Sequence, residues 1–127
     1  MMNASALDDI IDLSRRWEAA CRSCVTDDIV GMLSDDAVVW YNYEGVEHDR
    51  DAYRATLDSS RTSFRNVQYR DVRVMHHAGG FVEQATLVGD TDSGPIETPF
   101  LLIATVRDGK IARLDEYFDS TIMRGVD

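Results

Sequence analysis

The last strand-like segment of the chain reads Ile111-Ala-Arg-Leu-Asp-Glu-Tyr-Phe-Asp119 and follows the turn Asp108-Gly109-Lys110. Because successive side chains of a strand point to opposite faces, Glu116 shares its face with apolar residues only. These neighbours are Ala112, Leu114 and Phe118. A single carboxylate on an apolar face is costly unless it is paired or neutralised. Glu116 is therefore the strongest functional clue in the sequence.

The composition predicts one soluble globular domain that spans residues 1–127. Hydrophobic residues make up 44% of the chain and charged residues 28%, and 127 residues can bury one sizeable core but not two. The formal net charge of −10 disfavours nucleic acids and anionic membranes as partners, because like charges repel. Residues 1–9 have neither a basic region nor an apolar signal core, so we expect a cytoplasmic location.

Apolar residues recur at helical spacing in the first half of the chain. The spacing predicts an amphipathic helix over about residues 5–24, and Ser5-Ala-Leu-Asp8 has the spacing of a capping box. A short second helix is expected at about 27–33 and a third at about 49–62.

Strand-like segments dominate the rest of the sequence, where β-branched and aromatic residues are frequent. They are residues 37–43, 66–76, 81–89, 96–107 and 111–119. Because the helices come first and four hairpin-linked strands follow, the pattern predicts an α+β fold. We expect an antiparallel sheet from about 65 to 120 that helices cover on one side only.

Two cysteines match the spacing C-x-x-C, at Cys21 and Cys24. A zinc site would need two further ligands, and a redox motif would need a strand before a helix start. Since both residues fall in the second half of a predicted helix, we interpret them as buried, reduced core thiols. No set of His, Cys, Asp and Glu has metal-ligand spacing, so we expect neither a metal nor another cofactor.

The order of elements and two segments resemble the nuclear transport factor 2-like superfamily. The segments are Asp27-Asp28 with Leu33-Ser-Asp-Asp-Ala-Val-Val39, and the closing Glu-Tyr-Phe-Asp119. Within the superfamily, the SnoaL-like polyketide cyclases, ketosteroid isomerases and limonene epoxide hydrolases are the most similar, over roughly residues 7 to 123. This resemblance implies a cone-shaped, cystatin-like roll. In such a roll a curved antiparallel sheet and three N-terminal helices enclose a cavity.

The pattern of the epoxide hydrolases can be transferred residue by residue. Their acid immediately before Tyr-Phe-Asp corresponds to Glu116, in agreement with the alternation argument. Their Arg-x-Asp on an earlier strand corresponds to Gln84 and Thr86, and their Tyr-x-Asn to Val39 and Tyr41 or one residue later. Because the arginine and the second acid are missing, the resemblance does not extend to epoxide hydrolysis.

Glu116, Tyr41 and Gln84 are the predicted catalytic residues. Burial in an apolar cavity would raise the pKa of Glu116 and suit it to moving a proton next to a carbonyl. The alternative is a carboxylate paired with Arg54, Arg70 or Arg73, or one that lies at the wet mouth of the cone. The remaining predicted ligand-binding residues are Val39, Tyr43, Thr86, Thr98, Phe100, Leu102, Leu114 and Phe118.

The polar residues predicted to lie near Glu116 can also have purely structural roles. Tyr41 and Tyr43 share a strand face and can donate to a developing oxyanion, but tyrosines also fill cores. Gln84 can orient a ligand carbonyl or simply satisfy Glu116. His76 and His77 face opposite ways on a strand, so they cannot act as a pair.

The leading interpretation is a cofactor-free SnoaL-like enzyme of the isomerase, cyclase or dehydratase type that acts on a small apolar carbonyl compound. The alternative is a non-catalytic ligand-binding or dimerisation module of the same fold. The segment Ile96–Arg107 is apolar on both faces, so Leu101 and Ile103 would join Phe81 and Leu87 in an exposed outer patch. We therefore expect a homodimer that packs through the outer face of the sheet.

Overall fold

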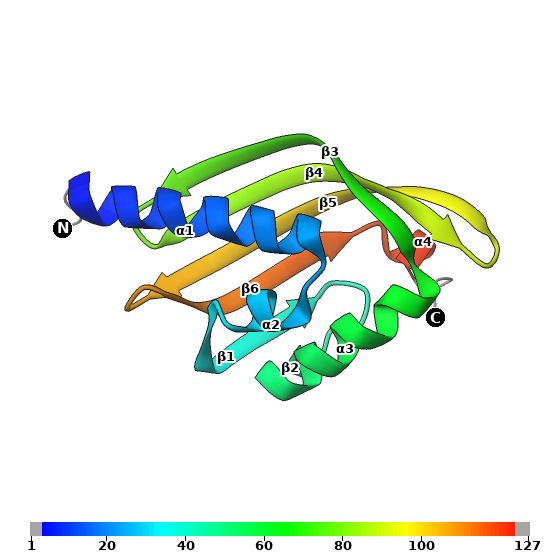
Figure 1. The fold of residues 1–127 in the computed structure, drawn as a ribbon, viewed down its shortest axis with the longest axis horizontal. Helices are drawn as coiled ribbons and strands as arrows, with labels where there is room; N and C mark the ends of the chain where they lie inside the picture. The colour runs from blue at the N-terminus through cyan, green and yellow to red at the C-terminus, as the bar shows by residue number, and fades with distance from the viewer. Residues whose placement is uncertain (1–3, 124–127) are drawn as a thin grey trace.

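The computed structural model describes residues 4–123 and shows helices packed on one face of a curved sheet (Figure 1). The helices are α1 (Ala4–Ser23), α2 (Thr26–Val30), α3 (Arg50–Ser63) and α4 (Ser120–Met123). The strands are β1 (Leu33–Tyr41), β2 (Glu47–His48), β3 (Arg65–His77), β4 (Gly80–Thr91), β5 (Gly94–Arg107) and β6 (Lys110–Phe118). The predicted α+β class and the curved sheet with leading helices are confirmed.

The sheet has the strand order β2-β1-β6-β5-β4-β3. Its strands from β3 to β6 form consecutive antiparallel hairpins, as predicted. The pair β1–β6 is parallel. The predicted antiparallel sheet covered about residues 65–120, so the pairing of the first strand was not predicted. The parallel pair arises because the chain leaves β1, crosses through α3 and the three long strands, and returns beside β1 only at its end.

The largest differences between the predicted and observed boundaries lie where α2 ends and β1 begins. The second helix ends at Val30 rather than 33, and the first strand begins at Leu33 rather than 37. Ser34-Asp-Asp36, which lies before the predicted strand, occupies an irregular part of β1 between Leu33 and Val38. Asp35 and Asp36 lie on the surface and pair with Arg50 and Arg107, so a strand tolerates them there. The short elements β2 and α4 were not predicted.

The long strand β3 carries two irregularities that bend it. Asn66 and Asp71 have positive φ angles of 55° and 53°, and the β3–β4 register shifts at both places. Bulges of this kind increase the local twist and bend of a strand. The bend lets the sheet curl around the helices instead of lying flat beneath them (Figure 1).

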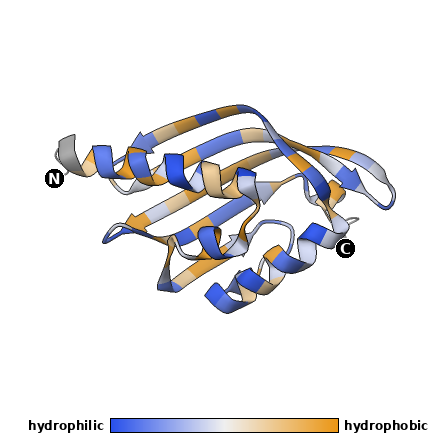
Figure 2. Ribbon diagram, viewed as in Figure 1, coloured by the Kyte–Doolittle hydropathy of each residue, from blue (hydrophilic) through white to orange (hydrophobic). Residues whose placement is uncertain are grey.

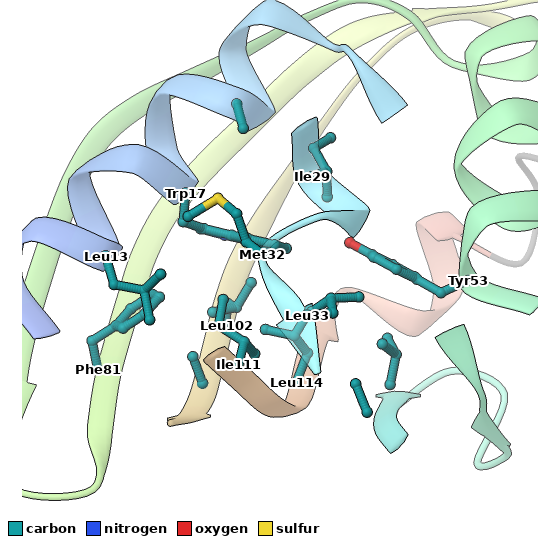
Figure 3. Close-up of a cluster of buried hydrophobic side chains, with 14 of the residues drawn as sticks. Leu13, Trp17, Ile29, Met32, Leu33, Tyr53, Phe81, Leu102, Ile111 and Leu114 are labelled. Carbon is teal, nitrogen blue, oxygen red and sulfur yellow. The ribbon is translucent and has the colours of Figure 1, made fainter. Parts of the chain in front are cut away.

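The core lies between α1 and the middle of the sheet. Residues of α1 at three- to four-residue spacing are buried, namely Ile10, Leu13, Trp17 and Ala20. Figure 3 shows Leu13 and Trp17 reaching toward side chains of the sheet, among them Phe81, Leu102 and Leu114. The strands alternate between apolar and polar residues along their length (Figure 2), and this alternation separates the helix-covered face from the outer face.

The face assignment of β4 is the main correction to the sequence analysis. Phe81 is fully buried and Leu87 is 5% exposed, so both point toward the helices and not into an outer patch. Leu101 and Ile103 are half-buried on the opposite face, as predicted. The outer apolar surface is thus smaller than the sequence analysis assumed, although Met75 and Tyr117 extend it.

Candidate functional site

A cavity of about 300 Å³ lies between the sheet and the helices. Its wall includes residues of α1, α2, α3 and α4 and of every strand except β2. The lining is largely apolar and aromatic, with two carboxylates, Glu83 and Glu116. Pockets of this size and character are typical of small-molecule sites.

Four neighbouring strands place their side chains in one row across the floor of the cavity. Tyr41 of β1 lies beside Glu116 of β6, Glu116 lies beside Leu102 of β5, and Leu102 lies beside Glu83 of β4. Adjacent strands are ~4.8 Å apart, so the two glutamates start from backbone positions roughly 10 Å apart. A small ligand above Leu102 can therefore meet both carboxyl groups.

Glu116 is buried in the way that the alternation argument predicted. Its side chain lines the cavity and the residue is 7% exposed. Burial, with a further contribution from the charge of Glu83, raises the pKa of Glu116 to about 8, while a hydrogen bond with Tyr41 acts in the opposite direction. Its Oε2 atom is buried and has no hydrogen-bond partner among residues 4–123. Within this range it also forms no ion pair, so the pairing with Arg54, Arg70 or Arg73 is wrong.

Glu83 is the functional candidate that the sequence analysis missed. It is 3% exposed, and burial together with the charge of Glu18 raises its pKa to about 7, with Arg22 opposing the shift. Arg22 lies mainly at the surface, where it pairs with Glu18 at 2.6 Å. The signal was present in the sequence, because Phe81, Glu83, Ala85 and Leu87 repeat the pattern of one acid on an apolar face.

Aromatic rings form a connected wall on one side of the cavity. Their centroids follow one another at 6.5 Å from Tyr53 to Tyr41, 6.3 Å from Tyr41 to Phe118, 5.1 Å from Phe118 to Phe100, and 6.1 Å from Phe100 to Tyr69. Burial and the charge of Glu116 raise the pKa values of the Tyr41 and Tyr53 hydroxyls well above their ordinary range. These hydroxyls therefore stay protonated and act as hydrogen-bond donors.

The structure brings together some of the other predicted site residues. Tyr41, Tyr43, Phe100, Leu102 and Phe118 line the cavity together with Glu116.

Other predicted site residues lie elsewhere. Gln84 is exposed and Thr86 half-buried on the outer face, because the register borrowed from the epoxide hydrolases was shifted by one residue. Thr98 is fully buried, where its hydroxyl donates to the Pro99 carbonyl at 3.0 Å and accepts from the Asp119 N–H at 3.1 Å. Val39 and Leu114 are fully buried in the core beneath the cavity wall.

The histidines do not line the cavity. His76 faces α1, where its Nε2 lies 2.8 Å from the Ser14 hydroxyl, and the exposed His77 accepts from the Gly79 N–H at 3.0 Å. The prediction that these two rings face opposite ways is confirmed.

The two cysteines differ from each other. Burial raises the pKa of the Cys21 thiol well above its ordinary range, and the residue lines the cavity. Cys24 is exposed, so its predicted burial is wrong. It adopts a positive φ of 58° just past the end of α1, where the chain turns away from the core. No cluster of three or more potential metal ligands occurs within residues 4–123.

A family model for the SnoaL-like domain matches residues 14–114 of the chain. The chain belongs to the SnoaL-like domain family. The match extends over most of the elements that build the cavity, from the middle of α1 to the middle of β6. No curated protein matches this SnoaL-like chain.

Solved structures show the same fold at low sequence identity. A candidate polyketide cyclase from Xanthomonas campestris pv. campestris is 20% identical, with a TM-score of 0.81, over 95% of this chain and 96% of its own. A nuclear transport factor 2-like protein of unknown function from Burkholderia pseudomallei is 13% identical, with a TM-score of 0.82, over 93% and 96%. The BvnE pinacolase from Penicillium brevicompactum is 11% identical, with a TM-score of 0.78, over 93% and 91%. The SnoaL-like chain therefore has the nuclear transport factor 2-like fold.

None of the helices within residues 4–123 is long and apolar enough to cross a membrane.

Proposed function

We propose that this SnoaL-like domain is a cofactor-free enzyme of the isomerase, cyclase or dehydratase type. Its substrate is a small, largely apolar carbonyl compound that binds in the cavity, and Glu116 moves a proton on it. The observation that carries this proposal is a carboxyl group that is buried in the cavity wall, has one oxygen without a partner among the described residues, and has a pKa of about 8.

The position of Glu116 suits proton transfer in two respects. A group whose pKa lies near the working pH can both give and take a proton, which is the condition for efficient general acid–base catalysis. The surrounding apolar residues also exclude water, so a charge that develops on the substrate interacts strongly with nearby dipoles.

Tyr41 is the natural assistant of Glu116 in this reaction. It sits directly beside Glu116 in the sheet, and its hydroxyl is protonated at any ordinary pH. The enolate that forms when a proton leaves the carbon next to a carbonyl carries its charge on oxygen. A buried hydroxyl close to that oxygen stabilises the charge without reorganisation. Gln84, which lies on the outer face, has no part in this proposal.

The comparisons support the class of reaction and not the substrate. The family match and the candidate polyketide cyclase favour chemistry of the cyclase or isomerase type. Sequence identities of 11% to 20% show the shared fold only, and this fold hosts unrelated activities. A non-catalytic ligand-binding module remains the competing function, and the following experiment separates the two.

The test combines a substrate screen with two matched variants. Ketones, lactones and polyketide-like aromatics are screened for thermal stabilisation of the protein, and the compounds that bind are then assayed for turnover or for exchange of carbon-bound hydrogen with D₂O. We expect Glu116→Gln to lower kcat by a factor of ~10² or more, because it keeps the shape but cannot transfer the proton. Glu97→Gln makes the same chemical change on the exposed surface of β5 and should leave kcat unchanged. Ligands that bind without turnover or exchange would favour the non-catalytic module, and an active Glu116→Gln would remove Glu116 from the mechanism.

A further inference from the structure

Glu83 has no role in the proposed reaction, although it is the second carboxyl group of the cavity. The residue is only 3% exposed, and its side chain forms no hydrogen bond or ion pair within residues 4–123. Leaving a carboxyl group in such a place is costly, because water no longer solvates it. Because Glu83 also lines the cavity, its carboxyl group is available to a ligand that binds there.

The chemistry around Glu83 is acidic and aromatic. The groups that face it are Glu18, Cys21 and Arg22 of α1, Tyr69 of β3 and Glu116 of β6. The guanidinium among them is engaged with Glu18 near the surface. Arg22 does not line the cavity, and the two cations that do, Arg61 and Arg65, pair with Asp58 and Asp92. The interior between the two glutamates thus offers negative or neutral groups to a ligand.

The aromatic wall adds a second feature that favours a cation. Faces of aromatic rings carry partial negative charge and attract ammonium groups, most strongly where water is excluded. The chain of rings from Tyr53 through Tyr41, Phe118 and Phe100 to Tyr69 lies in the same cavity as both carboxylates. Carboxyl groups without an ion pair among the described residues, together with a wall of aromatic rings, are the elements of an ammonium site.

We propose that the cavity binds a compact organic amine in its protonated form, with the ammonium group held by Glu83 and the aromatic wall. The inference deepens the proposed function: the substrate becomes a carbonyl compound that also carries an amine, anchored at Glu83 and processed at Glu116. The binding of the ammonium group at Glu83 depends only on the cavity and does not require that a reaction takes place there.

The pH dependence of binding has a defined sign. The amine pairs with the ionised form of Glu83, and the ordinary pKa of an alkylamine, like that of lysine, is ~10, so the amine stays protonated throughout. Since the pKa of Glu83 is about 7 in the free protein, the ionised fraction rises about tenfold between pH 6 and pH 8. The affinity for the amine should rise by about the same factor over this interval.

The test uses two probes of nearly equal size, 2-phenylethylamine and 2-phenylethanol, in isothermal titration calorimetry at pH 6 and pH 8. We expect the amine to bind at least tenfold more tightly than the alcohol at pH 8, and about tenfold more tightly at pH 8 than at pH 6. In Glu83→Gln the amine should lose at least tenfold in affinity while the alcohol keeps its affinity. The exposed Glu97→Gln, which changes the net charge equally, should bind both probes like the parent chain.

Several outcomes would overturn the inference. They are equal affinity for amine and alcohol, no binding of the amine up to millimolar concentration, an amine affinity that does not rise with pH, and an equal loss in Glu97→Gln. Should Glu83→Gln fail to fold, the rise in amine affinity between pH 6 and pH 8 is measured in Glu116→Gln, where Glu83 is the remaining carboxyl group of the cavity lining. Its absence there would overturn the inference. None of these measurements requires turnover, so a failure here leaves the role of Glu116 standing, and an active Glu116→Gln leaves the amine site standing.

Discussion

Strands β4 and β6 carry the same pattern of residues and face the same cavity. In β6 a single acid, Glu116, stands among apolar residues on the inward face, and in β4 Glu83 does so among Phe81, Ala85 and Leu87. Alternation within β6 alone predicts the inward direction of Glu116, and the structure agrees. In β4 a register borrowed from a resemblance placed Gln84 inward instead. The difference teaches that periodicity read within one strand was the better guide to side-chain direction than a motif transferred at low similarity.

The two acids also differ in their surroundings. Glu116 lies beside Tyr41 and has a hydrogen bond with it, and burial raises its pKa to about 8. Glu83 lies nearer to α1, where the guanidinium of Arg22 partly offsets the shift, and its pKa is about 7. Near neutral pH the cavity therefore holds a mostly protonated Glu116 and a partly ionised Glu83. This difference gives the two residues different tasks in our account, proton transfer and ligand anchoring.

The largest expected effect is on stability as a function of pH. Both acids have folded-state pKa values above the ordinary value of 4.5, so the folded state binds their protons more tightly than the unfolded chain. Their contribution is fully present below pH ~4.5 and is lost as pH rises toward 7 for Glu83 and 8 for Glu116. We expect the free energy of unfolding of the parent chain, measured with urea, to fall by an amount on the order of several kcal/mol between pH 4.5 and pH 8.5. The double variant Glu83→Gln, Glu116→Gln should not show this fall. Parallel curves for the two proteins would mean that neither acid is perturbed by burial.

A smaller effect on stability is expected when the residues at positions 83 and 84 are exchanged, which leaves the composition unchanged. The double variant Glu83→Gln, Gln84→Glu moves the acid from the cavity to the outer face of β4 without a change in net charge. At pH 8 the folded state should become more stable by ~1–3 kcal/mol, because a buried charge is replaced by a neutral amide and the new carboxylate is solvated. The affinity for 2-phenylethylamine should fall in the same protein. A less stable fold at pH 8 would show that Glu83 has a favourable partner in the folded state.

The smallest effect on the cavity is expected from the outer face of the sheet. We propose that the chain forms a homodimer through this face, where Leu101 and Ile103 are half-buried and Met75 and Tyr117 are exposed. Leu101→Glu should convert a dimer of twice 14.3 kDa into a monomer in light scattering. It should leave the affinity for the amine nearly unchanged, since Leu101 faces away from the cavity. A parent chain that is monomeric at micromolar concentration would contradict the dimer.

Much of the fold could be predicted because it depends on local patterns. The helical spacing of α1, the Asp108-Gly109 turn and the alternation in β6 each specify an element without reference to the rest of the chain. The parallel pairing of β1 with β6 could not be predicted in this way, because the register between Tyr41 and Glu116 depends on contacts between distant parts of the chain. The irregular start of β1 could not be predicted either, because its two acidic residues form ion pairs with Arg50 and Arg107, which are distant in the sequence.

The candidate site was predictable only in part. Glu116 was found because it lies on a regular strand whose inward face is apolar, whereas Tyr41 was found through the register transferred by resemblance. Thr98 was expected in the cavity, but its hydroxyl forms hydrogen bonds with backbone groups of Pro99 and Asp119. No sequence pattern predicts these two hydrogen bonds. Cys24 was expected in the core, but it is exposed at the rim of the cavity, just past the end of α1, where its φ angle is positive.

The central claim is that one cavity holds two buried carboxyl groups with raised pKa values. Carbon-detected NMR of protein labelled with ¹³C at the glutamate carboxyl carbon follows each titration directly, and Glu83→Gln and Glu116→Gln assign the two signals. We predict that Glu83 titrates near pH 7 and Glu116 near pH 8, and that Glu83→Gln lowers the pKa of Glu116. Two glutamates that both titrate at their ordinary value near pH 4.5 would contradict the account.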